Sequence, residues 1–249
     1  MTAPRQSTLD RSVAMQLAAT EYGRLAELLR DLDDVDWKQS TDCPAWDVRE
    51  MAAHNLGMAE MSASVFEQRR QTKQATVDAK ARGCMFIDAL TDLQVRKHGS
   101  ESADDIERAY AKLGPKAAKA RRRTPSFIRN RVMPVTQRLN GVDETWRVGY
   151  VVDSILTRDV WMHRVDITRA TGKQMLLTRE HDGVLVDNVV NEWADRHGQP
   201  FTLHLDGPAG GSWARGDGGA ELHLDAVEFC RILSGRAQGD GLLTTEVPF

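Results

Sequence analysis

Three residues in two distant stretches have the types and spacing of metal ligands. Asp159 and His163 are four residues apart in a segment with helical periodicity, which places both side chains on one helix face, one turn apart. An ionised carboxylate is costly on an apolar stripe, here Val148, Val152 and Ile155, unless a cation compensates it. His54 lies on a second stripe with Met51, Met58, Met61 and Val65. The sequence therefore predicts that two helices bring His54, Asp159 and His163 to one divalent cation.

Each of these signals also has a plainer interpretation. A lone histidine on an apolar stripe is more often a hydrogen-bonded core residue than a ligand. An Asp-X3-His pair can be a hydrogen bond on a helix face or an exposed polar stripe. The combination of the two favours the metal. Asp166, one turn after His163, is predicted to orient that imidazole, or else to be a capping charge near a helix end.

The remaining histidines and the cysteines are weaker candidates. His98 and His181 lie in polar contexts, and His204 and His223 occupy outward strand positions, so no second ligand cluster is expected. The three cysteines, Cys43, Cys84 and Cys230, are widely separated and odd in number. This pattern predicts reduced thiols rather than disulfides or a Cys-X-X-Cys site.

Composition describes an ordinary protein of moderate size. A chain of 249 residues can bury a sizeable core, and a net charge of −3 with 28% charged residues gives no general bias toward nucleic acid or anionic membranes. Residues 1–10 are polar, and no run approaches the ~20 apolar residues of a membrane span. We expect a cytoplasmic protein without a membrane partner.

One strongly basic stretch invites a nucleic-acid interpretation. Lys116 to Arg131 contains seven lysines and arginines and no acidic residue. However, Phe127 is its one aromatic residue, and no recognition motif accompanies it. We predict no nucleic-acid partner, and instead a solvated face or a site for anionic small molecules.

Periodicity predicts a mainly α protein with a small α+β part, divided into residues 1–174 and 175–249. Asp47 and Glu50 form a capping box for the second helix, and Gly114-Pro115 is expected to interrupt a helix that begins at Ser102. Period-two segments at 201–205 and 221–224, with glycine-rich turns, predict a small antiparallel meander. Further helices are expected at residues 9–32, 145–170, 182–197 and 226–233, with helix or packed connection at 85–95 and an extended end at 242–249.

Two motifs resemble those of the mycothiol-dependent maleylpyruvate isomerase family: Cys43 to Arg49 followed by Ala52-Ala53-His54, and Arg158 to Ile167 followed by Ala170-Thr171-Gly172. The segment that ends in Leu233-Ser234-Gly235-Arg236 resembles the family's C-terminal domain. The resemblance implies a DinB-like up-down four-helix bundle whose metal, usually zinc, is held at His54, Asp159 and His163. The family's best-known pattern has Glu where this chain has Asp159.

The resemblance also implies mycothiol as thiol cosubstrate. It further implies that an arginine of the second domain takes part in the chemistry, and Arg236 is the corresponding position. The alternative is that Arg236 is a surface residue after a helix cap. Two histidines and a carboxylate leave zinc a fourth position, which a thiolate can occupy before it attacks a small electrophilic substrate. Isomerisation and S-transfer both remain open. Lys119, Arg121 and Arg236 are candidates to meet anionic groups of a substrate.

Two other classes of function fit the same ligands. A two-His-one-carboxylate face can hold iron(II) for oxygen chemistry. A non-catalytic stress or regulatory protein could also use a structural metal. The oligomeric state is open between a monomer and a homodimer.

Overall fold

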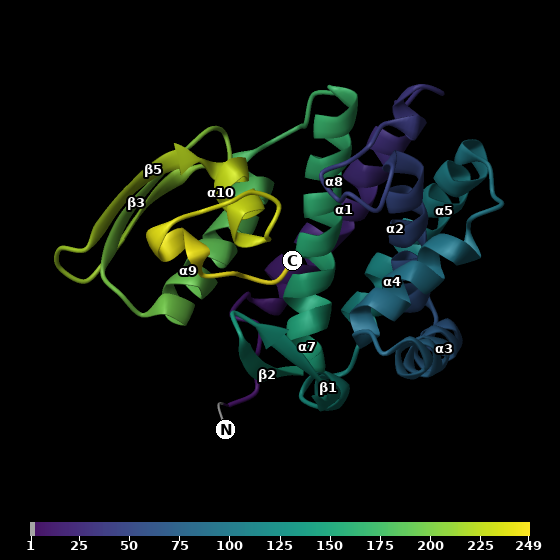
Figure 1. The fold of residues 1–249 in the computed structure, drawn as a ribbon, viewed down its shortest axis with the longest axis horizontal. Coiled ribbons are helices and arrows are strands. Elements are labelled where there is room, and N and C mark those ends of the chain that lie inside the picture. Colours follow the sequence, from purple (N-terminus) through teal and green to yellow (C-terminus); the bar gives the residue numbers. More distant parts are fainter. Residues whose placement is uncertain (1–2) are drawn as a thin grey trace. The chain divides into compact units, whose positions relative to one another are not determined.

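The computed structural model describes residues 3–249, and it confirms a mainly α fold with a small α+β part (Figure 1). Among these residues, no helix is long and apolar enough to cross a membrane. Helices and strands follow in the order α1 (Arg11–Arg30), α2 (Val48–Ala63), α3 (Val65–Arg82), α4 (Phe86–Lys97), α5 (Ala103–Arg123), α6 (Ser126–Arg129), β1 (Val132–Leu139), β2 (Val142–Arg147), α7 (Val148–Tyr150), α8 (Leu156–Thr171), α9 (Val184–His197), β3 (Phe201–Asp206), β4 (Gly211–Arg215), β5 (Ala220–Asp225) and α10 (Ala226–Leu233).

Contacts within the chain define two compact units. The helical unit comprises residues 18–125 and 163–173, and the mixed unit comprises the chain up to Leu17 with residues 126–162 and 174–249. Helix α8 is continuous and contributes residues to both. These two units interleave along the sequence. The division into domains 1–174 and 175–249 stays a prediction.

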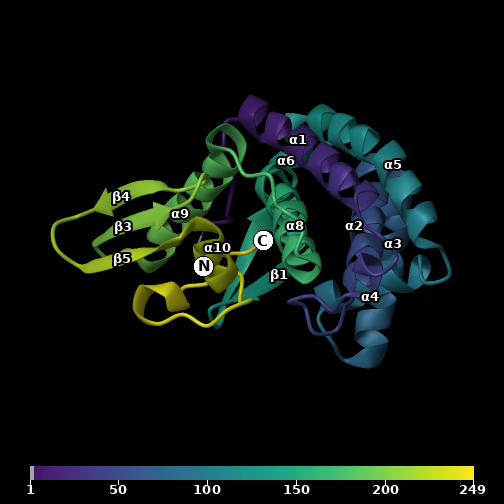
Figure 2. The same cartoon turned by 90° about the horizontal axis from the view of Figure 1, so that it is seen from above.

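In the helical unit, α1, α2, α5 and the second half of α8 form the bundle. The rings of Tyr22 on α1 and Tyr110 on α5 are 6.2 Å apart. Arg164 of α8 reaches Glu21 of α1 at 2.7 Å, with both side chains buried. Helices α2 and α5 lie side by side (Figures 1 and 2).

In this unit one helix boundary is set by a capping residue, and one expected helix break is absent. Ser64 has an extended backbone that ends α2, and its hydroxyl accepts a hydrogen bond from the backbone of Glu67 to begin α3. Helix α5 runs through Pro115, so the predicted interruption at Gly114-Pro115 is wrong. Gly114 lets α1 approach closely, because a Cβ there would lie 3.2 Å from Tyr22 Cβ. This packing holds the helix across a residue that ordinarily breaks it.

The mixed unit contains a hairpin that the sequence analysis missed. Strands β1 and β2 pair antiparallel around Asn140-Gly141, whose φ values of 50° and 74° suit a two-residue hairpin turn. The expected helix from Thr145 therefore begins at Val148.

A π-helical turn, Val151–Ile155, separates α7 from α8. It fits one extra residue into the turn and changes which side chains face inward. Asp153 and Ser154 are buried, whereas Val148 and Val152 are half-buried, so the predicted apolar stripe is not one buried face.

The C-terminal sheet has the strand order β4, β3, β5 (Figure 2). Strand β3 pairs antiparallel with β4 but parallel with β5, so the predicted antiparallel meander is wrong for the second pairing. Phe201, Leu203 and Leu205 point inward, and the Phe201 ring lies 4.8 Å from Trp193 of α9. Helix α10 begins at the predicted cap, Asp225. The C-terminal segment contains a short 3₁₀ helix, Gly241–Thr244, where extended chain was expected.

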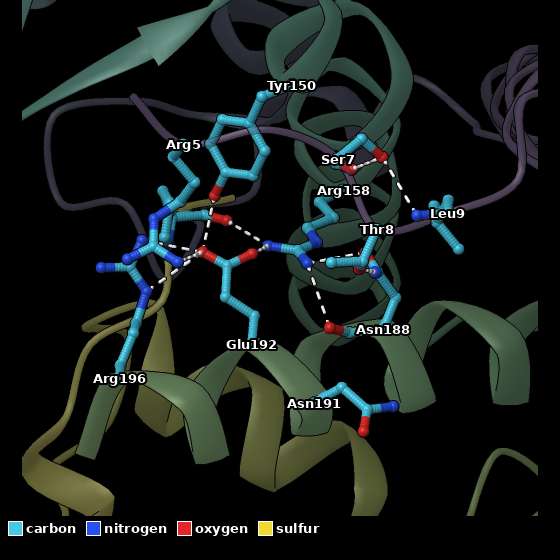
Figure 3. A network of polar contacts seen from close by, with 12 residues as sticks. Arg5, Ser7, Thr8, Leu9, Tyr150, Arg158, Asn188, Asn191, Glu192 and Arg196 are labelled. Carbon is cyan, nitrogen blue, oxygen red and sulfur yellow. Dashed lines mark hydrogen bonds and ion pairs between the residues drawn. The ribbon is translucent and has the colours of Figure 1, made fainter. Parts of the chain in front are cut away.

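A buried polar network fixes the first half of α8 within the mixed unit (Figure 3). Arg158 pairs with Glu192 of α9 at 2.8 Å and donates to Asn188 Oδ1 at 2.7 Å. Tyr150 and Arg196 also donate to Glu192. Burial alone would raise the pKa of Glu192, but the two guanidinium groups outweigh it and hold the pKa below the ordinary value.

Candidate metal centre

The structure brings together the three residues predicted as metal ligands. His54 on α2 and His163 on α8 are buried, and their ring centroids are 5.1 Å apart in an edge-to-face arrangement. Asp159 is half-buried and precedes His163 by one turn of the same helix. One potential ligand atom of each residue lies within 4.8 Å of the others. That they bind a metal stays a prediction.

A chain of amides orients His54. Its Nδ1 lies 2.8 Å from Oε1 of Gln94 on α4, and the Gln94 amide nitrogen donates to Oε1 of Gln71 on α3 at 2.9 Å. Because the amide nitrogen is engaged elsewhere, the Gln94 oxygen is the acceptor and His54 Nδ1 is the donor. The lone pair of His54 is then on Nε2, where a cation can use it.

Close packing around a glycine permits this chain. Gln71 and Gln94 are completely buried, and the Gln71 amide donates to the Gly57 carbonyl at 3.2 Å. A Cβ at Gly57 would lie 2.6 Å from Gln94 Cγ, closer than real contacts allow. Gly57, one turn after His54, thus permits α4 to place Gln94 within hydrogen-bond distance of His54.

Asp166 plays the corresponding part for His163. Its Oδ2 lies 3.2 Å from His163 Nδ1, and the carboxylate is fully buried. Since α8 continues to Thr171, Asp166 is not a capping residue, and its predicted orienting contact is confirmed. Nδ1 of each imidazole therefore faces an acceptor, which is the usual arrangement behind ligands that bind through Nε2.

The segment before α2 lies against the two histidines. Trp46 stacks on His54 with ring centroids 5.0 Å apart and lies 6.1 Å from the His163 ring. Asp47 and Glu50 form the predicted capping box, which fixes the start of α2 directly after Trp46. Cys43 Sγ donates to Asp166 Oδ2 at 4.0 Å. The Trp46 indole thus covers one side of the two imidazoles.

Outside this centre, both ring nitrogens of His98 form hydrogen bonds with carboxylates, whereas a metal ligand keeps one nitrogen for the metal. Its Nδ1 lies 2.9 Å from Glu101 and its Nε2 lies 3.3 Å from Glu60. Burial opposes protonation, but the hydrogen bonds to the two carboxylates outweigh it and raise the pKa of His98. In its protonated form His98 donates from both ring nitrogens, and neither then offers a lone pair to a metal.

The expectation of no second cluster is wrong. His204 and His223 lie side by side on adjacent strands, together with Asp206. The parallel pairing of β3 with β5, which the sequence analysis did not predict, places the two histidines opposite each other.

The predicted anion-binding residues are scattered. Arg121 is buried with its guanidinium 5.7 Å from the Tyr22 ring centroid, so it packs within the bundle instead of facing solvent. Lys119 is exposed on α5, and Arg129 pairs with the buried Asp153. Arg236 follows Gly235, whose φ is 78°, beyond the end of α10, and it is half-buried. Its role stays a prediction.

Gln71, Gln94 and Gly57 were missed by the sequence analysis. Gln71 lies in a polar tract that resembles a solvated face, and Gln94 lies in a segment without clear periodicity. A signal was present in Gly57, because a glycine one turn after a candidate ligand indicates close approach of another chain segment.

Comparison with known proteins identifies the family and the fold. Residues 18–168 match the model of the mycothiol maleylpyruvate isomerase N-terminal domain. The crystal structure of a mycothiol-dependent maleylpyruvate isomerase is similar over 96% of this chain and 95% of that one, with 17% identity and a TM-score of 0.58. The structure of a histidine-to-alanine mutant of such an enzyme has the same coverage, with 16% identity and a TM-score of 0.57. No curated protein matches the sequence significantly.

Proposed function

The chain belongs to the mycothiol maleylpyruvate isomerase N-terminal domain family, and from that premise we propose that it is a metal-dependent enzyme that uses mycothiol to isomerise, or to conjugate, a small electrophilic substrate. His54, Asp159 and His163 would hold the metal. The observation that carries the proposal is the orientation of the two imidazoles, whose Nδ1 atoms face Gln94 and Asp166.

The donor set fits zinc. Two imidazole nitrogens and one carboxylate are the ligands of many catalytic zinc sites, which keep a further position open. A bound zinc ion lowers the pKa of a thiol at that position, so that the thiolate exists at neutral pH. Trp46 would exclude water beside this position, while Gln94 and Asp166 would hold the imidazoles in place.

The reaction balances without an oxidant or a reductant. The thiolate sulfur forms a bond to one carbon of a conjugated C=C bond, and the π electrons of that bond move onto the conjugated carbonyl oxygen. Rotation about the resulting single bond precedes return of the electron pair, which re-forms the double bond and expels the thiolate; if a proton adds to the carbon instead, the thioether conjugate results. An isomerase returns the thiol unchanged, whereas a transferase releases the conjugate. Arg236 is the proposed contact for an anionic substrate such as maleylpyruvate.

Asp159 is the distinctive element of the proposed centre. Aspartate is one methylene shorter than the glutamate of the family's best-known pattern. We expect Asp159→Glu to keep the metal and Asp159→Ala to lose it. Loss with both substitutions would indicate that the backbone of α8 is placed for the shorter side chain.

The test begins with tag-free full-length protein from which metal has been removed with a chelator. After reloading with Zn²⁺, calorimetric titration with mycothiol should show binding that is absent from the metal-free protein and from His163→Ala. Turnover of maleylpyruvate with mycothiol, followed by its absorbance, distinguishes isomerisation from formation of a stable conjugate. His223→Ala, a histidine-to-alanine change outside the centre, is the matched control and should bind the thiol normally.

If the zinc-loaded, folded protein binds neither mycothiol nor another small thiol, the proposal is wrong. Elemental analysis of protein purified without added metal separates the remaining alternatives. Iron together with oxygen-dependent turnover would favour an oxygenase. Bound zinc without thiol binding would favour a non-catalytic protein.

A further inference from the structure

The outer face of the C-terminal sheet carries a second group of two histidines and a carboxylate. The alternation of buried and exposed residues along β3 places His204 and Asp206 outward, and His223 points outward from β5. One potential ligand atom of each lies within 4.8 Å of the other two. All three are exposed and belong to the mixed unit.

Strand register explains why they meet. His204 and His223 are direct partners in the parallel pairing of β3 with β5, and their rings lie 5.0 Å apart. Asp206 is two residues beyond His204, on the same face of the central strand. Two positions on one strand and one on its neighbour form a triangle above the sheet.

The distances are close to those of a metal site. His223 Nε2 lies 2.8 Å from Asp206 Oδ2, and His204 Nε2 lies 3.8 Å from Asp206 Oδ1. Ligand atoms about 2.1 Å from a tetrahedral zinc ion are about 3.4 Å apart, a value between these two. Small rotations of exposed side chains bring all three into range.

A neighbouring hydroxyl orients one ligand. His204 Nδ1 lies 2.7 Å from Ser212 Oγ on β4, while its Nε2 faces Asp206. A hydroxyl accepts a hydrogen bond as readily as it donates one, so Nδ1 can carry the proton and leave the Nε2 lone pair for a cation. Asp225, nearby on β5, is committed to capping α10, whereas Glu221 is an exposed carboxylate on the same face as His223.

We propose that His204, Asp206 and His223 form a surface site for a divalent transition-metal ion such as Zn²⁺, Ni²⁺ or Cu²⁺. Imidazole nitrogens select these ions over Mg²⁺ and Ca²⁺, which prefer oxygen ligands. The remaining coordination positions face solvent and take water. The site is independent of the centre on α2 and α8, since the two share no residue.

The test counts metal ions on tag-free full-length protein after removal of metal with a chelator. Calorimetric titration with Zn²⁺, checked by native mass spectrometry, should give one equivalent fewer for His223→Ala and for His204→Ala than for the unmodified protein. Glu221→Gln, on the same strand and face as His223, is the matched control and should keep every equivalent. Circular dichroism establishes that each variant is folded.

Histidine ¹H–¹⁵N correlation spectra of the unmodified protein give a second readout that needs no variant. Addition of Zn²⁺ should shift the Nε2 resonances of both His204 and His223, whereas Mg²⁺ should leave them unchanged. Equal Zn²⁺ stoichiometry and affinity in His223→Ala and the unmodified protein, with unshifted resonances, overturn the proposal. His163→Ala removes an ion only at the other centre, so either site can fail without the other.

Discussion

Two clusters in this molecule have the same three donors but opposite surroundings. His54 and His163 are almost completely buried, whereas the His204 and His223 side chains are 56% and 65% exposed. On the helices, the imidazoles are held by Gln94 and Asp166, and Gln94 is itself held by Gln71. On the strands, the exposed Ser212 hydroxyl lies beside His204 Nδ1. The comparison teaches that the two clusters differ less in their donor residues than in the groups that contact those residues.

The difference in preorganisation between the two clusters predicts a difference in their affinity for Zn²⁺. Ligands already fixed in place lose little conformational freedom when a cation binds, whereas exposed side chains must first be ordered. A dry surrounding also strengthens the attraction between carboxylate and cation. We therefore expect the helical centre to bind Zn²⁺ more tightly than the sheet site.

The largest expected difference is in how much Zn²⁺ affinity is lost when one histidine is removed from each cluster. His163→Ala should weaken Zn²⁺ binding at the helical centre by more than about 100-fold, which exceeds the ~10–100-fold typical of losing an outer partner. His204→Ala should change the weaker site alone. Competition with a chromogenic chelator measures both affinities. A larger loss of affinity from His204→Ala than from His163→Ala would reverse the ranking.

Removal of an orienting group tests the comparison more finely. Gln94→Leu eliminates the acceptor for His54 Nδ1 and should weaken Zn²⁺ binding by about 10–100-fold. Ser212→Ala is the counterpart on the sheet, and its effect should be smaller, because water can replace an exposed hydroxyl. Equal losses in the two variants would mean that the buried amide chain adds nothing to affinity.

The glycine beside the amide chain can be tested through stability. Gly57→Ala places a methyl group where Gln94 lies, and it should lower the free energy of unfolding by about 1–3 kcal/mol in urea titration. Gly23→Ala in α1 is the matched control, since a Cβ there has no neighbour within 4 Å. That change should raise the free energy of unfolding by about 0.5–1 kcal/mol. If both changes stabilise the protein, the close approach at Gly57 is not tight.

The smallest expected effect concerns pH and a histidine that is not a ligand. The raised pKa of His98 adds stability that is complete below its ordinary pKa of 6.5 and is lost as the pH rises through the folded-state value. His98→Asn should remove this dependence from urea titrations of metal-free protein. Metal binding has the opposite pH dependence, because ligating imidazoles must be neutral. If the dependence persists in His98→Asn, another group causes it.

The proximity of Asp159 and His163 was predictable because their spacing is a local property. Asp159 and His163 are four residues apart in an unbroken helix, and the capping box at Asp47 fixes where α2 begins. The mainly α class followed from the same periodicity. Asn140-Gly141 carried an equally local signal for the β1–β2 hairpin, but it was overlooked.

The features that local pattern cannot reveal depend on which segments pair. Gln94 reaches His54 across 40 residues of sequence, and no periodicity in α4 indicates it. His204 meets His223 only because β5 pairs with β3 in parallel, while the order of strands in the chain favoured a meander. Pro115 stays helical because tertiary packing outweighs a local propensity.

The π-helical turn before α8 separates the β1–β2 hairpin and α7 from the helix that carries Asp159 and His163. Because it holds one residue more than an ordinary turn, loss of a residue there would restore a regular α-helix and rotate everything before it by about 100°. Asp159 and His163 both follow the turn, so their mutual spacing would survive such a deletion. The buried position of Asp153, within the turn, would not. A deletion in this turn would therefore change the orientation of the β1–β2 hairpin relative to α8 and leave the spacing of Asp159 and His163 unchanged.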